Sequence, residues 1–377
     1  MGKTGLSVSD IGFGIAVTTD PRLLVDAYRR GVNYFDISPA YSWSVTMLAE
    51  AFQLDPGMRK EAIVASRIEC LSLTDHMRCF GQISEGRNSN PEVCVGCIDE
   101  ILKKLGRSHL DILQLHGVGQ AGETDLEFLD PNTRKGSGLL SFFESLKRQG
   151  KVRFAGITTH GPHLLDAAFD RAVASGNFDM IMSALNFMQA PSPDMHRSLL
   201  AAAERGVGVT AMKVLANARA RNVALAGRPF SHAAIAWALS QPGVNNVVIT
   251  IDNWARLDEY LGASGQGLSL LDRARLARHR SATSNHYCRV GCGRCLGSCP
   301  HGVDIPTMLR LDQYRSLYGF PAMAAAQYRA FAGRDLLRAC LHCREPRCEA
   351  ACPYGLALRS RLQIAYRHLH GQGTALA

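Results

Sequence analysis

The sequence predicts an α/β protein in which a closed barrel of eight parallel strands and eight helices, the (β/α)8 or TIM barrel, precedes a small helical region. Short apolar runs alternate eight times with amphipathic stretches over about 280 residues. Eight of the 12 cysteines fall between Cys288 and Cys352. No glycine-rich phosphate turn follows an early strand, which disfavours an open doubly wound sheet.

Each expected strand is a short apolar run followed by a helical pattern. The strands are expected to begin near Ile11, Val32, Ala62, Asp111, Val152, Met180, Val207 and Asn245. The clearest helix begins at Pro21, with Asp20 as its cap. A second clear helix ends at Gly106.

The charge changes after the last expected helix. Residues 283–377 carry 12 arginines, no lysine and five acidic residues, a net charge of +7, whereas residues 1–282 carry only +2. We therefore expect a barrel domain over 1–282 and a separate domain over 283–377. The nearly neutral barrel and the lack of a recognisable motif argue against nucleic acid as a partner. With no long apolar run and no signal-peptide pattern, we expect a cytoplasmic protein that does not span a membrane.

The cysteines near the C-terminus form two blocks, and each block ends in Cys-Pro. The first block, C-x3-C-x2-C-x3-C-P, contains Cys288, Cys292, Cys295 and Cys299. The second block, C-x2-C-x4-C-x3-C-P, contains Cys340, Cys343, Cys348 and Cys352. This spacing predicts two [4Fe-4S] clusters, in which the cysteine before proline often binds the other cluster. Two zinc sites are the alternative, and the segment between the blocks has a helical pattern.

Polar residues stand at or after successive strand ends. Asp36 ends the second expected strand and Tyr41 follows it, while Arg67 ends the third and His116 the fourth. Each residue alone is compatible with a helix cap or a satisfied core position. Because strand ends of a TIM barrel converge on one face, their joint placement predicts an active site there.

Five stretches resemble the aldo/keto reductase family: GKTGLSVSDIGFG, RGVNYFDISPAY, LKKLGRSHLDILQLH, GKVRFAGITTHG and AAERGVGVTAMKVL. The resemblance covers nearly all of residues 1–282. With the cysteine blocks included, the chain is similar to the branch of this family whose barrel is followed by a ferredoxin-like 4Fe-4S domain. The resemblance implies NAD(P)H-dependent reduction of a carbonyl, or oxidation of an alcohol, at the C-terminal face of the barrel.

The resemblance also assigns catalytic roles. The family's Asp, Tyr and His match Asp36, Tyr41 and His116, and Arg67 stands where the family has lysine. By resemblance, Tyr41 protonates the carbonyl oxygen and His116 positions that oxygen. Arginine supplies a positive charge, but its guanidinium is bulkier and planar, so we expect altered or weak reductase activity.

Three further residues are expected to bind the nicotinamide cofactor, either NADP or NAD. Asn186 resembles the family residue that holds the nicotinamide amide, and Arg256 falls at the position of the arginine that binds adenosine phosphate. Lys213 ends the seventh strand, where it can meet a phosphate or carboxylate. Ile249 and Thr250 replace the usual start of the loop after the eighth strand, so the chain departs from the family at the 2′-phosphate site.

Three functions are compatible with a barrel joined to iron-sulfur clusters, because hydride transfer moves two electrons and each cluster accepts one. The sequence favours a carbonyl reductase or alcohol dehydrogenase with a small-molecule substrate. In the second function, an external ferredoxin or flavoprotein feeds the clusters while the barrel holds the substrate. In the third, the protein is a non-catalytic iron-sulfur interaction module.

Overall fold

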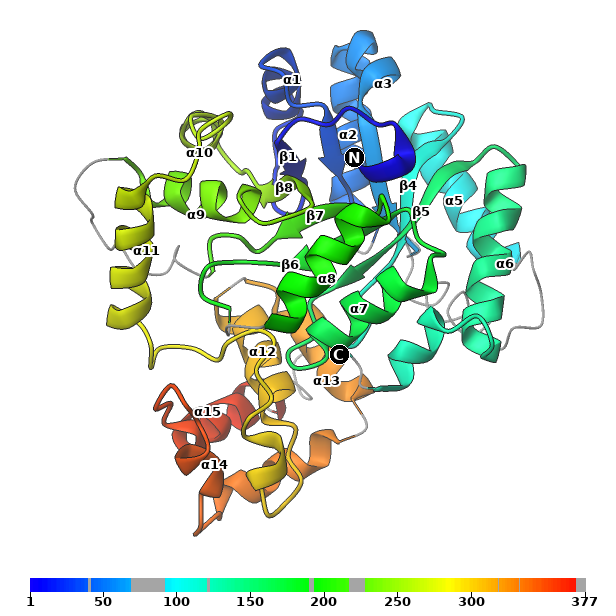
Figure 1. The fold of residues 1–377 in the computed structure, drawn as a ribbon. Helices are drawn as coiled ribbons and strands as arrows, with labels where there is room; N and C mark the ends of the chain where they lie inside the picture. The colour runs from blue at the N-terminus through cyan, green and yellow to red at the C-terminus, as the bar shows by residue number, and fades with distance from the viewer. Residues whose placement is uncertain are drawn as a thin grey trace.

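The computed structural model describes residues 1–39, 42–68, 92–120, 123–189, 193–216, 228–317, 319–331 and 333–370. Its centre is a closed barrel of eight parallel strands, in the order β1 to β8. Helices surround the strands, and a helical region lies below them in the view of Figure 1. The TIM barrel predicted from the sequence is therefore confirmed.

The eight strands are short, and most of their residues are buried. Their bounds are Ile11–Gly14 (β1), Tyr34–Asp36 (β2), Ile63–Arg67 (β3), Leu110–Leu115 (β4), Val152–Thr159 (β5), Met180–Ala184 (β6), Gly208–Met212 (β7) and Val244–Thr250 (β8). Each strand pairs in parallel with the next, and the ring closes where Gly14 of β1 lies opposite Thr250 of β8. Because all strands run in one direction, their C-terminal ends meet at one face.

The outer helices begin and end at signals that the sequence carries. Asp20 caps α1 by accepting a hydrogen bond from the backbone N–H of Arg22, and Pro21 occupies the first turn, as predicted. The helix before Gly106 ends at Leu105, and Gly106 has a φ of +61° that suits glycine. The bounds are α1 Pro21–Arg29, α2 Ser42–Leu54, α3 Pro56–Glu61, α5 Glu92–Leu105, α6 Arg134–Arg148, α7 Leu165–Ser175, α8 Pro193–Glu204, α9 Phe230–Leu239, α10 Trp254–Leu261 and α11 Leu270–Ala282. Within the described ranges, no helix has the length and apolarity needed to cross a membrane.

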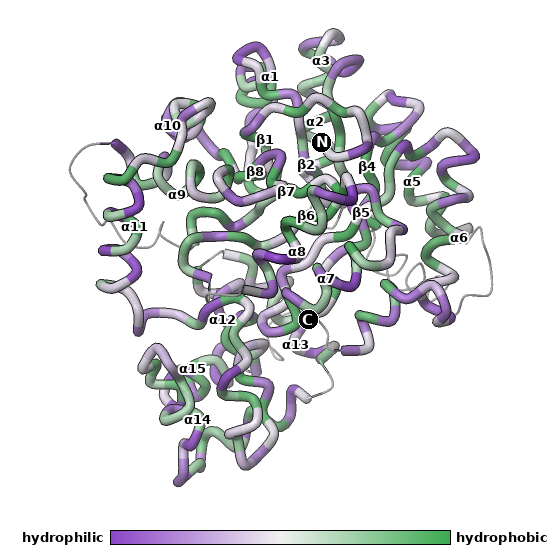
Figure 2. The backbone as a smooth tube through the Cα atoms, viewed as in Figure 1, coloured by the Kyte–Doolittle hydropathy of each residue, from purple (hydrophilic) through white to green (hydrophobic). Residues whose placement is uncertain are grey.

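Apolar side chains form layers on both sides of the strands. The larger cluster lies between the strands and the surrounding helices. A smaller cluster fills the barrel and includes Tyr34, Ile112, Met182 and Met212. Figure 2 shows hydrophobic stretches along the strands and hydrophilic ones on the outer helices. Met182 and Met212 also line the pocket described below, so the interior core ends at the floor of that pocket.

The chain after α11 forms a helical region with its own apolar cluster. Its elements are the α-helices Ile305–Ser316 (α12), Pro321–Ala330 (α13), Arg347–Ala350 (α14) and Leu358–His370 (α15), and the 3-10 helices Leu296–Ser298 and Arg334–Leu341. Its described residues include no strand, in agreement with the helical pattern of the sequence. Leu337, Leu362 and Ala365 are among the fully buried residues of this cluster.

The helical region packs against the C-terminal face of the barrel. Gln120, which lies after β4, donates a hydrogen bond of 2.8 Å to the side-chain oxygen of Gln327 in α13. The backbone N–H of Gly291 donates to the carbonyl of Pro162, which follows β5, at 2.8 Å. In Figure 1, α12 and α13 lie beside the barrel while α14 and α15 lie further away. The first two helices are thus placed next to the strand ends.

Candidate active site at the mouth of the barrel

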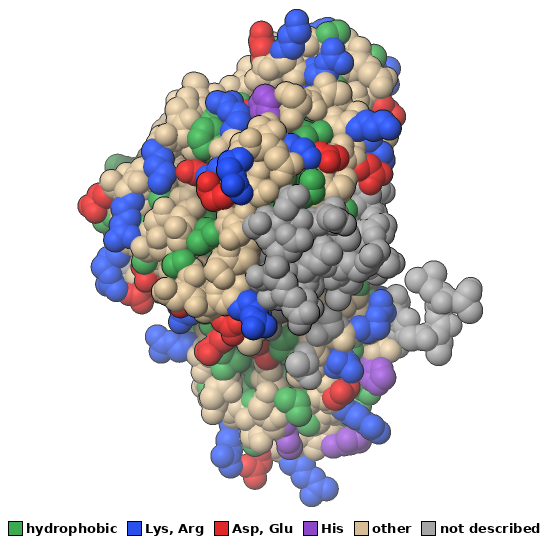
Figure 3. Space-filling model, turned by 90° about the vertical axis from the view of Figure 1, so that its right-hand side faces the viewer, with side chains coloured by type: hydrophobic (Ala, Val, Ile, Leu, Met, Phe, Trp, Pro, Cys, Tyr) green, Lys and Arg blue, Asp and Glu red, His purple; other side chains and the backbone are tan. Residues whose placement is uncertain are grey.

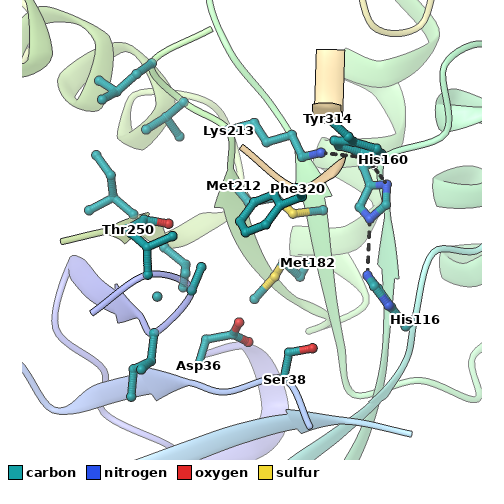
Figure 4. Close-up of a pocket in the computed structure, with 18 of the residues that line it drawn as sticks. Asp36, Ser38, His116, His160, Met182, Met212, Lys213, Thr250, Tyr314 and Phe320 are labelled. Carbon is teal, nitrogen blue, oxygen red and sulfur yellow. Dashed lines mark hydrogen bonds between the residues drawn. The ribbon is translucent and has the colours of Figure 1, made fainter. Parts of the chain in front are cut away.

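A pocket of about 290 Å³ opens at the C-terminal ends of the strands. This volume is near the lower end of the range for small-ligand sites. Residues at or just past the ends of several strands form one wall (Figure 4). The helical region contributes Tyr314, Leu317, Phe320 and Gln327 to the lining. Both parts of the chain therefore build the site.

Asp36 and Arg67 form a buried ion pair between the ends of β2 and β3. Arg67 Nη2 lies 2.7 Å from Asp36 Oδ1, and the two side chains are 12% and 5% exposed. Arg67 Nη1 donates to the carbonyl of Ile37 at 2.8 Å. Burial raises the pKa of Asp36, while the charge and hydrogen bond of Arg67 oppose that shift. These contacts hold the planar guanidinium in the wall of the pocket.

A chain of hydrogen bonds crosses the mouth from Lys213 to His116, as Figure 4 shows. The Lys213 ammonium donates to the hydroxyl of Tyr314 at 3.0 Å. That hydroxyl lies 3.3 Å from Nδ1 of His160, and Nε2 of His160 lies 3.3 Å from Nε2 of His116. The chain links the residues that follow β4, β5 and β7 to a side chain of α12.

Burial controls the protonation of this chain. It lowers the pKa of His160 well below the ordinary value, and the charge of Lys213 adds to the shift. Burial also lowers the pKa of Lys213, with a further contribution from Arg310. His160 is therefore neutral at pH 7 and carries one ring proton. If Nδ1 accepts from the Tyr314 hydroxyl, that proton sits on Nε2 and faces His116.

The lowered pKa of His160 predicts a pH-dependent stability. The unfolded chain binds a proton near the ordinary pKa of 6.5, but the buried ring does so only at lower pH. The stabilisation from neutral His160 is fully present above that pH and declines below it, by up to about 1.4 kcal/mol per pH unit. We expect urea unfolding at about pH 7.5 and about pH 5.5 to show a smaller acid-induced loss in His160→Asn than in wild type. An equal loss in both proteins would contradict this expectation.

The structure brings four of the predicted site residues to one pocket. Asp36, Arg67, His116 and Lys213 all line it. Tyr41 lies outside the described residues, so its catalytic role stays a prediction. The expectation that strand ends converge on one face therefore selected residues that line the same pocket.

The other two residues predicted to bind cofactor do not line this pocket. Asn186 lines a neighbouring cavity of about 20 Å³ together with Lys213, and its side-chain oxygen accepts from the N–H of Met188 at 3.0 Å. Arg256 lies in the first turn of α10 and pairs with Asp252, its side chain 34% exposed. Their cofactor roles stay predictions.

Sequence reasoning missed His160 and Tyr314. His160 directly follows β5, so the strand-end argument that selected His116 also applies to it. Tyr314 lies in α12, more than 60 residues after the end of β8, and no local pattern marks it. Its place in the mouth depends on how α12 packs.

The eight cysteines of the two blocks are free and are buried or half-buried. Their mutual effects on pKa divide them into two thiol groups. The first thiol group contains Cys288, Cys292, Cys295 and Cys352. The second thiol group contains Cys299, Cys340, Cys343 and Cys348. Burial is the main factor that raises the pKa of Cys288, Cys295 and Cys340 to about 12, with smaller contributions from nearby thiols. Each group combines three cysteines of one block with a cysteine of the other.

No three potential ligands in the described part of the chain lie close enough together to bind a single metal ion. A single zinc ion needs its thiolates converged on one centre. A [4Fe-4S] cubane instead distributes its thiolates over four irons, so its ligands are more widely spaced. The described part of the chain therefore supports neither a zinc site nor an iron-sulfur cluster directly, and both stay predictions from the sequence.

The arginines of the helical region differ in their exposure to solvent. Arg289 and Arg310 are only 3% and 6% exposed, and their charges lower the pKa of Cys288 against the effect of burial. The exposed ones are Arg294, Arg329, Arg338, Arg344, Arg347 and Arg367. Basic side chains and histidines are visible over the lower end of the face in Figure 3. The helical region therefore has buried positive charge beside the first thiol group as well as a solvated basic surface.

Comparison with known proteins identifies the family. Residues 15–225 match the family described as the aldo/keto reductase family. Because this match covers more than half of the chain, the protein belongs to the aldo/keto reductase family, as the sequence motifs predicted.

Individual relatives are more distant. L-galactose dehydrogenase from Arabidopsis thaliana is 31% identical over 197 residues, which are 48% of this chain and 54% of that protein. The chain thus matches about half the length of this curated relative. Aldo-keto reductase AKR11C1 from Bacillus halodurans has a TM-score of 0.55 in its holo form, at 20% identity over 74% of this chain and 94% of that one. Its apo form gives 0.52, at 18% identity over the same shares of both chains. At these identities the two structures show the fold alone.

Proposed function

We propose that this protein is an NAD(P)H-dependent oxidoreductase of the aldo/keto reductase type, which reduces a carbonyl or oxidises an alcohol at the barrel mouth. The observation that carries this proposal is the pocket in which Asp36, Arg67 and His116 face one small volume. Family membership supports it, because aldo/keto reductases generally use NAD(P)H. Similarity to L-galactose dehydrogenase makes sugars a first substrate class to test.

The residues of the mouth have distinct roles in this reaction. A bound nicotinamide supplies or accepts the hydride. His116 hydrogen-bonds the substrate oxygen, and Tyr41 is the family tyrosine expected to meet the same oxygen. Arg67, held by Asp36, supplies positive charge that stabilises the alkoxide as it develops.

Two basic residues, one in the pocket and one on α10, suit the phosphates of a dinucleotide. Lys213 lines the pocket, while Arg256 on α10 reaches solvent. A cation at each position suits the pyrophosphate and adenosine phosphate of such a cofactor. Asn186, beside Lys213, presents an amide that suits the nicotinamide carboxamide. We assign cofactor binding to these three residues.

We further propose that residues 283–377 form a ferredoxin-like domain with two [4Fe-4S] clusters, one on each thiol group. The combination of three cysteines from one block with a Cys-Pro cysteine from the other supports this assignment. Buried Arg289 and Arg310 suit the negative charge of a thiolate-ligated cluster on the first group. The clusters would supply one-electron transfer.

A second candidate function is electron transfer from an external ferredoxin or flavoprotein through the clusters to a substrate in the barrel. Cys288 and Lys213 line the same cavity of about 20 Å³, so the first thiol group lies next to the mouth. That proximity favours exchange of electrons between a cluster and a ligand in the pocket. The exposed arginines suit an acidic redox partner.

An anaerobic titration of cluster-loaded protein with NADPH and then NADH tests these functions. We expect saturable binding, seen as a change in nicotinamide fluorescence, and oxidation of the nucleotide when a panel of aldehydes, quinones and sugar-derived carbonyls is added. His116→Asn is expected to lower turnover by about 10²-fold or more, because a hydrogen bond to the reacting oxygen is lost. Tyr28→Phe, on α1 outside the pocket, is the control and should match wild type.

The same titration separates the alternatives. Bleaching of the cluster absorbance by NADPH would show that electrons reach the clusters. Activity that requires a reduced ferredoxin instead of a nicotinamide would replace the first function by the second. Absence of ligand binding in the pocket and of turnover with either donor would leave the non-catalytic interaction module.

A further inference from the structure

Two buried arginines lie between the first thiol group and the barrel mouth. Arg289 directly follows Cys288 and is 3% exposed, and Arg310 on α12 is 6% exposed. We propose that both donate hydrogen bonds to the [4Fe-4S] cluster on the first thiol group and raise its reduction potential above that of the cluster on the second thiol group. This inference rests on the two clusters of the proposed function. It adds a direction of electron flow, toward the barrel mouth.

Each of the two arginines has a buried donor without an acceptor. Among the described residues, Arg289 Nη1 and Arg310 Nε have no hydrogen-bond partner. Arg289 Nη2 donates to the carbonyl of Ser284 at 3.3 Å. The central carbon of this guanidinium lies 5.2 Å and 4.9 Å from the ring centres of Tyr287 and Tyr354. Because a buried donor without an acceptor destabilises the fold, an acceptor that is not an amino-acid side chain suits these positions.

The charges of the two arginines also require a counter-charge. Within the part of the chain that the structure describes, neither guanidinium forms an ion pair with a carboxylate. A buried charge without a partner is strongly destabilising. Burial raises the pKa of Cys288, and the charges of Arg310 and Arg289 oppose that shift. Negative charge on the first thiol group is therefore in a position to compensate both.

The cavity beside these arginines is too small for a larger anion. Its volume is about 20 Å³, and its lining includes Cys288, Arg289, Arg310 and Lys213. One water molecule requires about 10–15 Å³, so the cavity has no room for a phosphate or a dinucleotide. Cluster charge held by Cys288 is then the source that fits.

Helix α12 connects the first thiol group with the mouth. Arg310 and Tyr314 are four residues apart, so they lie on the same face of this helix. Arg310 lines the small cavity with Cys288, whereas Tyr314 lines the large pocket. In Figure 1, α12 lies beside the barrel, while α14, which carries Cys348, lies further away. The first thiol group is thus the one next to the mouth.

The second thiol group has an acidic neighbour. Glu349 directly follows Cys348 on α14 and is half-buried. Burial raises the pKa of Cys348, and both a neighbouring thiol and the Glu349 carboxylate add to that shift. Glu349 Oε1 accepts a hydrogen bond from the backbone N–H of Arg359 at 3.0 Å, which fixes the carboxylate. Negative charge of this kind lowers the potential of a cluster.

The arginines adjacent to the second group in the sequence do not offset this acid. Arg344 and Arg347 are exposed, and Arg347 pairs with Glu345 at 2.9 Å. Water and salt screen such charges, whereas buried charges and donors act on a cluster with little screening. An electron delivered by an external ferredoxin or flavoprotein would therefore come to rest on the first group, beside the mouth.

A redox titration of the anaerobically purified, cluster-loaded protein tests this order. Electron paramagnetic resonance of the reduced clusters gives the two reduction potentials. We expect Arg310→Gln to lower the higher potential by at least the equivalent of a tenfold change in the reduction equilibrium, about 59 mV for one electron. The lower potential should stay unchanged. Arg310→Lys retains the charge and should lower the higher potential less.

Two further variants complete the test. Arg294→Gln is the matched control, because Arg294 directly precedes Cys295 of the first thiol group but is exposed. It should change the reduction equilibrium of either cluster by less than about threefold. Glu349→Gln should raise the lower potential and leave the higher one unchanged, because its carboxylate lies beside the second thiol group.

The outcomes distinguish this proposal from the clusters on which it rests. Equal potentials in wild type, or an Arg310→Gln variant in which neither potential or only the lower one moves, would overturn the proposal and leave both clusters in place. If Arg310→Gln does not fold, an unmoved lower potential in Glu349→Gln would equally overturn the proposed order. Absence of iron and of a cluster signal in wild type would overturn the clusters and this inference together.

Discussion

If each thiol group holds a [4Fe-4S] cluster, as proposed, removing Cys352 is expected to abolish the cluster on the first thiol group, although this cysteine belongs to the second block of the sequence. In the structure Cys352 raises the pKa of Cys288 and Cys295, as a nearby thiol does. We therefore expect Cys352→Ala to lower the iron content from about eight to about four per chain, with a matching loss of visible absorbance.

Double variants give the sharper test. Cys352→Ala combined with Cys295→Ala should lose no more iron than either single variant, because the proposal assigns both cysteines to the same cluster. Cys352→Ala combined with Cys340→Ala should lose nearly all iron, because the second thiol group is then damaged as well. The reverse pattern, with full loss in the first pair, would contradict the crossed grouping. Iron and sulfide analysis of anaerobically purified protein provides the measurement.

Replacing Asp36 by asparagine is expected to destabilise the barrel strongly. The carboxylate is buried against Arg67 at 2.7 Å, and Gln114 donates to its second oxygen at 3.4 Å. Asp36→Asn leaves the guanidinium in the pocket wall without this carboxylate. Removing one partner of a buried pair typically destabilises by about 3–5 kcal/mol. The free energy of unfolding in urea, measured near neutral pH, gives the result.

An exposed ion pair supplies the matched control. Asp20 pairs with Arg22 at 2.6 Å, with side chains 27% and 74% exposed. Asp20→Asn keeps the helix cap of α1, because asparagine caps as well as aspartate. We expect its effect to stay below about 1 kcal/mol. If both variants lost the same free energy of unfolding, the buried ion pair would not stabilise the fold more than the exposed one, which would contradict the expectation.

The sequence by itself determined the barrel and much of its mouth. Apolar residues recur with a different spacing in strands than in helices, and each spacing is visible within a few positions of the sequence. Once eight strand–helix units are recognised, the closed parallel sheet brings all strand ends to one face. That rule was sufficient to select Asp36, Arg67 and His116, which share one pocket. It would also have selected His160, had it been applied to the fifth strand.

Only the tertiary structure decided what stands opposite those strand ends. The contact between Lys213 and Tyr314 joins residues 101 positions apart. The grouping of Cys352 with the first block likewise depends on how the helices between the blocks fold back. Contacts of this kind arise when separate apolar clusters pack together, and no periodicity within a segment specifies its partner. The sequence therefore determined the barrel wall of the site, and the docking of α12 decided that a tyrosine faces it.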